Sequence, residues 1–189
     1  MSRAVFFVAL LFAASAAQAA TAISVIGTGY ARGCFEAAQK RLPLRQALRV
    51  CDSALLDEAL ASNDRAATFV NRGIVQMQAK KLDAAIADYD AAIKVRPDIA
   101  EAYVNKGIAL MQHGNRDDEA VVQLSEGIAR NPLRPEIAYY TRGVANEGLG
   151  RAREAFEDYS RAAQLAPDWP EPAEQLQRFQ TVRRKTGLG

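Results

Sequence analysis

Few residues in this 189-residue chain belong to the types that do metal or redox chemistry. There are two cysteines, Cys34 and Cys51, and a single histidine, His113. A zinc site needs several Cys, His or carboxylate ligands, and a lone histidine in a predicted inter-helix turn cannot complete that set. A Cys-x-x-Cys spacing, typical of thiol exchange, is also missing. We therefore predict no metal site and no redox centre.

Motifs for covalent catalysis are also absent from the sequence. Neither Gly-x-Ser-x-Gly nor a P-loop occurs, and the short Gly27-x-Gly29 does not make a dinucleotide fingerprint. The adjacent carboxylates Asp117 and Asp118 fall in a predicted turn, where acidic side chains commonly cap a helix or face solvent. The sequence thus predicts no catalytic residues and no cofactor, and we expect the protein not to be an enzyme.

What the chain does carry is a threefold repeat between residues 66 and 169. Each copy has an aromatic residue, a small residue four positions later, a small/bulky/small trio at i, i+4 and i+7, and then a proline; the middle copy has leucine and glycine in the trio. The copies are Phe69, Gly73, Ala85, Tyr89, Ala92, Pro97; Tyr103, Gly107, Ala120, Leu124, Gly127, Pro132; and Tyr139, Gly143, Ala155, Tyr159, Ala162, Pro167. Small residues at facing positions let two antiparallel helices approach closely, and the proline ends the second helix. The spacing therefore predicts helical hairpins.

This pattern resembles the tetratricopeptide repeat (TPR), a helix-turn-helix unit of about 34 residues. The resemblance implies an all-α solenoid with repeats at 66–99, 100–135 and 136–169. A degenerate hairpin and an extended lead-in precede them at 20–65, and a capping helix with a tail follows at 170–189. Such repeats typically act as scaffolds for protein partners.

Residues 1–19 read as a signal peptide. A basic n-region with Arg3 precedes an apolar run and an Ala-x-Ala site ending at Ala19, so the mature chain would begin at Ala20. The alternative is a membrane anchor, but the apolar run is shorter than the ~20 residues that a spanning helix needs. We expect export, without a stable membrane span after cleavage, and a periplasmic location if the source is a Gram-negative bacterium.

The two cysteines fall symmetrically about a predicted break between Leu42 and Pro43, which separates helices at 33–41 and 44–61. In an antiparallel hairpin Cys34 and Cys51 then lie at the same height on facing helices. In an exported chain this favours a disulfide over two free thiols. The bridge would close a loop of about 16 residues and stabilise the fold by about 3 kcal/mol.

Two charge pairs recur at matching heights across the repeats. Arg72 faces Asp88 in the first hairpin, and Arg142 faces Asp158 in the third. The middle hairpin has lysine and glutamine at these positions, so both members of the pair change together, as expected of a structural ion pair. The alternative is two solvated charges, since exposed pairs contribute only about 0–1 kcal/mol.

The TPR resemblance also implies a binding groove on the concave face, lined by the first helix of each repeat. The positions that would line it are Val70, Asn71, Ile74, Met77, Val104, Asn105, Ile108, Met111, Tyr140 and Val144. Relatives that grip a terminal carboxylate carry cations here, but this chain has apolar residues beside its two asparagines. The groove would hold an extended or helical segment by apolar packing, oriented by the asparagine amides. Alternatively, residues 21–30 of the chain itself cover this face.

These observations predict an exported module that binds a protein or peptide segment. Alternatives are an accessory or regulatory subunit of an envelope enzyme or assembly complex, and a purely structural envelope protein. The formal charge of +2 is spread through the repeats without a basic stripe, so no nucleic-acid partner is expected.

Overall fold

The computed structural model describes residues 20–25 and 29–186, with side chains as far as Phe179. The predicted signal peptide lies outside the described residues. Within them the fold is all-α, without strands, as predicted. The helices are α2 (Tyr30–Lys40), α3 (Leu44–Asp57), α4 (Ser62–Gln78), α5 (Leu82–Val95), α6 (Ala100–His113), α7 (Asp117–Ala129), α8 (Pro135–Gly148), α9 (Ala152–Leu165) and α10 (Pro170–Thr186).

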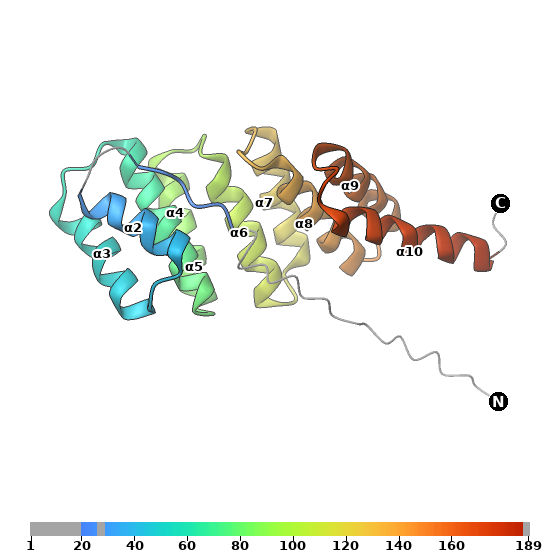
Figure 1. The fold of residues 1–189 in the computed structure, drawn as a ribbon, viewed down its shortest axis with the longest axis horizontal. Helices are drawn as coiled ribbons and strands as arrows, with labels where there is room; N and C mark the ends of the chain where they lie inside the picture. The colour runs from blue at the N-terminus through green and yellow to red at the C-terminus, as the bar shows by residue number, and fades with distance from the viewer. Residues whose placement is uncertain (1–19, 26–28, 187–189) are drawn as a thin grey trace, which may run out of the picture.

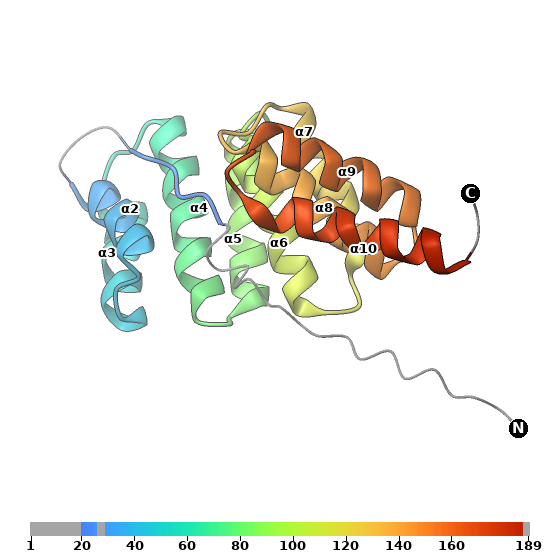
Figure 2. The same ribbon diagram turned by 45° about the vertical axis from the view of Figure 1, so that its right-hand side comes forward.

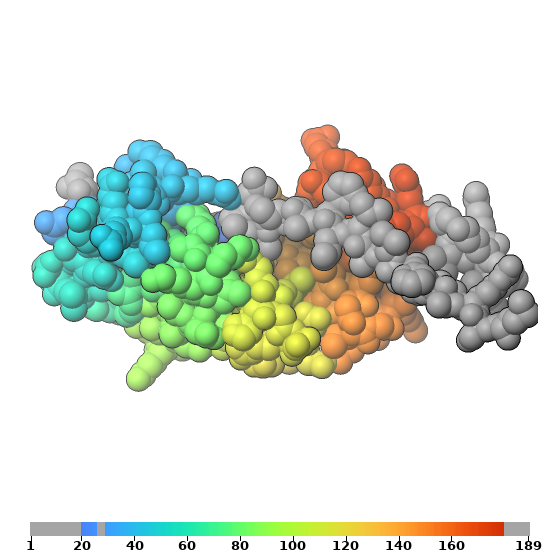
Figure 3. Space-filling model, turned by 90° about the horizontal axis from the view of Figure 1, so that it is seen from below, coloured from blue at the N-terminus to red at the C-terminus, as the bar shows by residue number. Residues whose placement is uncertain are grey.

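Consecutive helices pair as antiparallel hairpins that stack in a row, α2–α3 first and α8–α9 last, with α10 packed on the end (Figures 1 and 2). Seen from below, the hairpins adjoin one another in chain order (Figure 3). The part of the chain that the structure describes contains no helix both long and apolar enough to cross a membrane.

Each repeat closes where a bulky side chain of the second helix lies over a glycine of the first. An added Cβ at Gly73 would come within 2.6 Å of the Tyr89 ring, so the two helices can approach this closely only at glycine. The same contact recurs down the stack, at Gly73–Tyr89, Gly107–Leu124 and Gly143–Tyr159. The predicted pairing of small with bulky residues is therefore what sets the spacing within each hairpin.

The first hairpin has a disulfide at the corresponding place. The Cys34 and Cys51 sulfurs are 2.01 Å apart, and both residues are fully buried. Helix α2 begins at Tyr30, three residues before the predicted start, because the Glu58 carboxylate accepts the N–H groups of Tyr30 and Ala31. The backbone turns extended at Glu58, so α3 ends at Asp57, earlier than predicted.

Helix α10 covers the open end of the stack. Trp169 lies against Tyr140, with ring centroids 4.8 Å apart, and Phe179 contacts the rings of Phe156 and Tyr159. Val182 continues the apolar spacing of Leu176 and Phe179 along this helix, and its side chain lies outside the described residues. The described residues thus cap the last repeat with aromatic contacts.

Candidate peptide-binding groove

The chain's own N-terminal segment, residues 20–25, lies across the first helices of two repeats (Figure 1). We call it the strap. The Ile23 N–H donates to Asn71 Oδ1 at 2.9 Å, and Asn71 Nδ2 donates to the Ile23 carbonyl at 2.7 Å. Asn105 makes the same two bonds with Thr21, both at 3.1 Å. Alternate strap residues are thus held by both of their backbone polar groups, as an extended chain allows.

The two asparagines suit this role because an amide side chain carries both a donor and an acceptor. Asn71 lies on α4 and Asn105 at the same position of α6, one repeat later, and both are fully buried. In α8 this position holds Thr141, whose shorter side chain has one hydroxyl oxygen in place of the separate donor and acceptor atoms of an amide. The hydrogen bonds between the strap backbone and these two asparagines, which we call the amide ladder, are therefore made by α4 and α6.

The apolar positions predicted to line the groove differ between the repeats. In α4 and α6 they are buried in the main core, at Val70, Ile74, Met77, Val104 and Ile108. Ala20, Ala22 and Ile23 of the strap pack against that core. Met111, Tyr140 and Val144 are only partly buried. Of the two alternatives left by the sequence, self-coverage thus describes the first two repeats, where the expected open groove is filled.

Both predicted charge pairs are formed. Arg72 contacts the two carboxylate oxygens of Asp88 at 2.6 and 2.8 Å, and Arg142 contacts those of Asp158 at 2.7 and 2.9 Å. The aspartate side chains are only 6% exposed. These are therefore bidentate ion pairs with buried carboxylates, and the contribution of about 0–1 kcal/mol to stability that holds for exposed pairs does not apply to them.

Burial and pairing act on the Arg72–Asp88 pair in opposite directions. Hydrogen bonds to Asp88 raise the pKa of the Arg72 guanidinium. Burial raises the pKa of the Asp88 carboxyl, and this outweighs the lowering by Arg72. The carboxylate is thus costly to bury, and its arginine is what makes the charge tolerable.

A second contact of these cations was not foreseen from the sequence. In each repeat the first-helix cation also reaches the residue that follows the bulky position in the preceding hairpin. The contacts are Arg72–Asp52 at 2.7 Å, Lys106–Asp90 at 2.6 Å and Arg142–Ser125 at 3.0 Å. The available signal was a polar residue directly after Cys51, Tyr89 and Leu124. Arg72 and Arg142 therefore link neighbouring hairpins as well as the helices of their own hairpin, and Lys106 links neighbouring hairpins.

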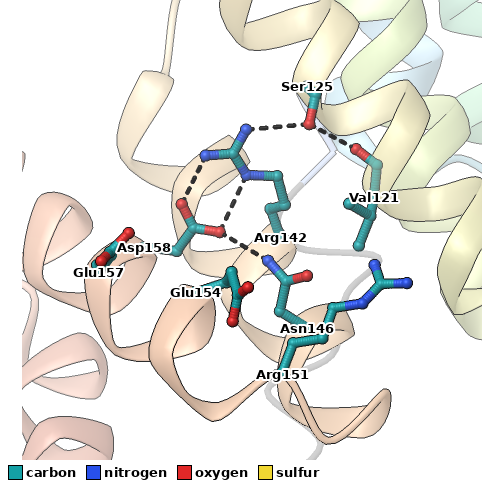
Figure 4. A pocket seen from close by; sticks show the side chains of 8 residues that line it. All are labelled: Val121, Ser125, Arg142, Asn146, Arg151, Glu154, Glu157 and Asp158. Atoms are coloured by element: carbon teal, nitrogen blue, oxygen red, sulfur yellow. Dashed lines mark hydrogen bonds and ion pairs between the residues drawn. The ribbon is translucent and has the colours of Figure 1, made fainter.

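The third pair lines a pocket of about 430 Å³ between α7, α8 and α9 (Figure 4). Asn146 donates to Asp158 at 3.1 Å, and Arg142 donates to Ser125. Arg151, also at the pocket, is paired with Asp118. Most charges here are thus neutralised by protein groups, which suits a structural network better than a catalytic one.

Other candidates for chemistry are not brought together. His113 ends α6 with its Nε2 atom 3.1 Å from an oxygen of Asp83, and both side chains are exposed. Among the described residues, no group of three or more His, Cys, Asp and Glu side chains could hold a metal ion. The candidate site is therefore the concave face with its strap.

Comparisons with known proteins agree with this architecture. A family model described as TPR repeat matches residues 73–114, and another, described as tetratricopeptide repeat, matches residues 137–168. Among curated proteins, none matches this chain.

Several solved structures share the fold. A crystal structure of MamA is 19% identical with a TM-score of 0.69, covering 86% of this chain and 88% of that one. A structure of MamA from residue 41 to the end, from Desulfovibrio magneticus RS-1, is 22% identical with a TM-score of 0.67. It covers 85% of this chain and 88% of that one. The first TPR of Spaghetti (RPAP3), bound to the HSP90 peptide SRMEEVD, is 24% identical with a TM-score of 0.60. It covers 65% of this chain and 95% of that one. At these identities the likeness is one of fold.

Proposed function

Because the chain is a tetratricopeptide-repeat protein, we propose that it is an exported protein-protein interaction module whose concave groove binds an extended segment of a partner protein. Repeats of this type build surfaces for binding, and function resides in what those surfaces display. The signal-like residues 1–19 and the buried disulfide support export, since disulfides persist in oxidising compartments.

One observation carries the proposal: the groove already holds an extended backbone. Asn71 and Asn105 make four hydrogen bonds to alternate residues of the strap. Hydrogen bonds to the main chain give affinity for any segment of that shape, and adjacent pockets select side chains. The RPAP3 repeat, a protein of similar fold, was solved with a peptide bound. Apart from these two asparagines the buried groove positions are apolar and carry no cation, so the proposed contact does not require a terminal carboxylate.

The proposal is tested by site-specific photo-crosslinking in the native compartment. A photoreactive residue at Val144, on the partly exposed concave side of α8, should give adducts with a defined protein partner. The matched control is Val122, which is 56% exposed on α7. Adducts from Val144 that disappear on Met111→Glu, with an unchanged melting temperature, support a groove ligand. Equal adducts from both sites, or none from Val144, contradict it.

Export is tested separately by mass spectrometry of fractionated cells. We expect the intact chain in the periplasmic fraction to begin at Ala20. A chain that keeps residues 1–19 and remains in the cytoplasmic fraction would contradict the proposed location.

A further inference from the structure

We infer that the strap is an intramolecular ligand that competes with the partner, and that the partner supplies an uncharged, extended segment of small and β-branched side chains. The inference rests on the proposed function, whose groove it assigns to one class of ligand. It follows from the backbone contacts of the strap, the side chains it buries and the extent of the ladder.

The backbone contacts show how the strap is recognised. Thr21 and Ile23 each give both main-chain polar groups to one asparagine, and no strap side chain takes part in these bonds. A segment from another chain with N–H groups at the same two positions can make identical bonds. Proline at either position cannot, because it lacks the donor.

The side chains show which segments fit. The strap reads Ala-Thr-Ala-Ile-Ser-Val and carries no charge. Val25 is 3% exposed in a small cluster with Ala31, Ala54 and Ala67, whereas Ser24 faces solvent. Ala20, Ala22 and Ile23 pack against an apolar core cluster that includes Val70, Ile74 and Ile108. A charged side chain placed there would lose its hydration without a partner, so charged segments are selected against.

The extent of the ladder shows why the strap can be displaced. With cleavage after Ala19, the mature chain would begin one residue before the first rung, so the strap spans only α4 and α6. Helix α8 continues the concave face with Val144, which is only partly buried, whereas Tyr140 packs against Trp169. A longer partner segment can therefore reach α8 and bury surface that the strap leaves uncovered. The strap competes through its tethering, which is equivalent to about millimolar free ligand.

The experiment uses the alternation of the strap. Thr21→Pro/Ile23→Pro removes both N–H donors of the ladder at unchanged chain length. The matched control is Ala22→Pro/Ser24→Pro, which places two prolines at positions outside the ladder. Each protein is titrated calorimetrically with a C-terminally amidated peptide of the strap sequence.

We expect the peptide to bind the Thr21→Pro/Ile23→Pro variant at least about tenfold more tightly than the wild type or the control, because the tethered competitor is released. Adding Asn71→Ala/Asn105→Ala should abolish this binding, whereas Asn63→Ala, an exposed asparagine on the same helix, should leave it unchanged. A peptide with aspartate in place of the isoleucine should bind more weakly.

Equal affinity for all strap variants would overturn the competition. No binding to any of them would overturn the assigned ligand class, while adducts from Val144 would still support the proposed function. If the odd-numbered proline variant does not fold, hydrogen exchange on the wild type decides. Saturating peptide should then speed exchange of the Thr21 and Ile23 amides, and unchanged rates would refute the inference.

Discussion

The first and third repeats join their two helices through a buried ion pair, whereas the middle repeat joins them through apolar packing. In the outer repeats a side-chain amide of the first helix also hydrogen-bonds the aspartate of the pair. In the middle repeat the arginine, the amide and the aspartate are all replaced. The sets are Arg72, Gln76 and Asp88; Lys106, Leu110 and Gln123; and Arg142, Asn146 and Asp158. Leu110 is fully buried. The three positions thus change together, and the middle repeat has a buried leucine in place of the amide and an uncharged glutamine in place of the aspartate.

The contact between hairpins does not follow this alternation. Lys106 keeps its bond to the preceding hairpin, through Asp90, although its own hairpin has Gln123 at the place of the paired aspartate. The cation is therefore retained for the junction between repeats, and the aspartate only where the arginine fork is present.

The largest expected effect comes from breaking one pair on one side. Arg72→Met leaves the buried Asp88 carboxylate without its cation, and we expect a loss of about 3–5 kcal/mol in the free energy of unfolding. Lys106→Met should cost no more than about 1 kcal/mol, because its partner Asp90 is 54% exposed. Urea denaturation of both variants measures the difference. Equal losses would show that the two repeats are not distinguished by the pair.

The disulfide extends the comparison to the first hairpin, since Cys34 and Cys51 occupy the place of the glycine and the bulky residue in the repeats. Cys34→Ala/Cys51→Ala should lower the free energy of unfolding by about 3 kcal/mol, because the unfolded chain loses its cross-link. Both sulfurs are buried, so native protein should resist thiol alkylation until it is unfolded and reduced. Full labelling of unfolded, unreduced protein would show that the bridge does not form.

The sequence predicted the recurring features within each hairpin and the disulfide between the two cysteines, but not the recurring cation contacts between hairpins or two features that depend on single contacts. Hairpins, glycine contacts and charge pairs recur, so each copy supports the interpretation of the others. The early start of α2 depends on the carboxylate of Glu58, the residue that follows α3. Sequence periodicity does not reveal this contact. The strap was one of two open alternatives, because its place is decided by Asn71 and Asn105, about 50 and 80 residues further along the chain.

Converting the first repeat to the middle one tests whether the three positions act as a unit. Arg72→Lys/Gln76→Leu/Asp88→Gln should cost less than about 1.5 kcal/mol, although Arg72→Met alone costs more, because no buried charge is left unpaired. The measurement is a denaturation series with a double-mutant cycle on Arg72 and Asp88. A coupling of zero, or additive losses in the triple variant, would favour independent solvated charges.

The smallest expected effect separates the two outer repeats, which differ at the buried tyrosine. The Tyr159 hydroxyl donates to Glu147 at 2.8 Å, whereas the Tyr89 hydroxyl is buried without a hydrogen-bond partner among the described residues. In α4 the place of Glu147 is taken by Met77. Tyr159→Phe should therefore cost about 1 kcal/mol at neutral pH, and Tyr89→Phe should be neutral or slightly stabilising.

Alkaline pH acts on both tyrosines in the same direction. Burial raises the pKa of both tyrosines, and for Tyr159 the bond to Glu147 adds to it. Because the folded state keeps each phenol neutral, its contribution to stability is complete below about pH 10 and declines as the unfolded chain ionises, by about 1.4 kcal/mol per pH unit for each tyrosine. Tyr89→Phe should remove the pH-dependent loss of stability that Tyr89 causes. The free energy of unfolding of this variant should therefore exceed that of the wild type increasingly between about pH 10 and 11. Urea denaturation at several pH values measures this, with Tyr30→Phe as the control at an exposed tyrosine. If the Tyr89→Phe and wild-type curves decline in parallel, the Tyr89 phenol ionises as readily in the folded protein as in the unfolded chain.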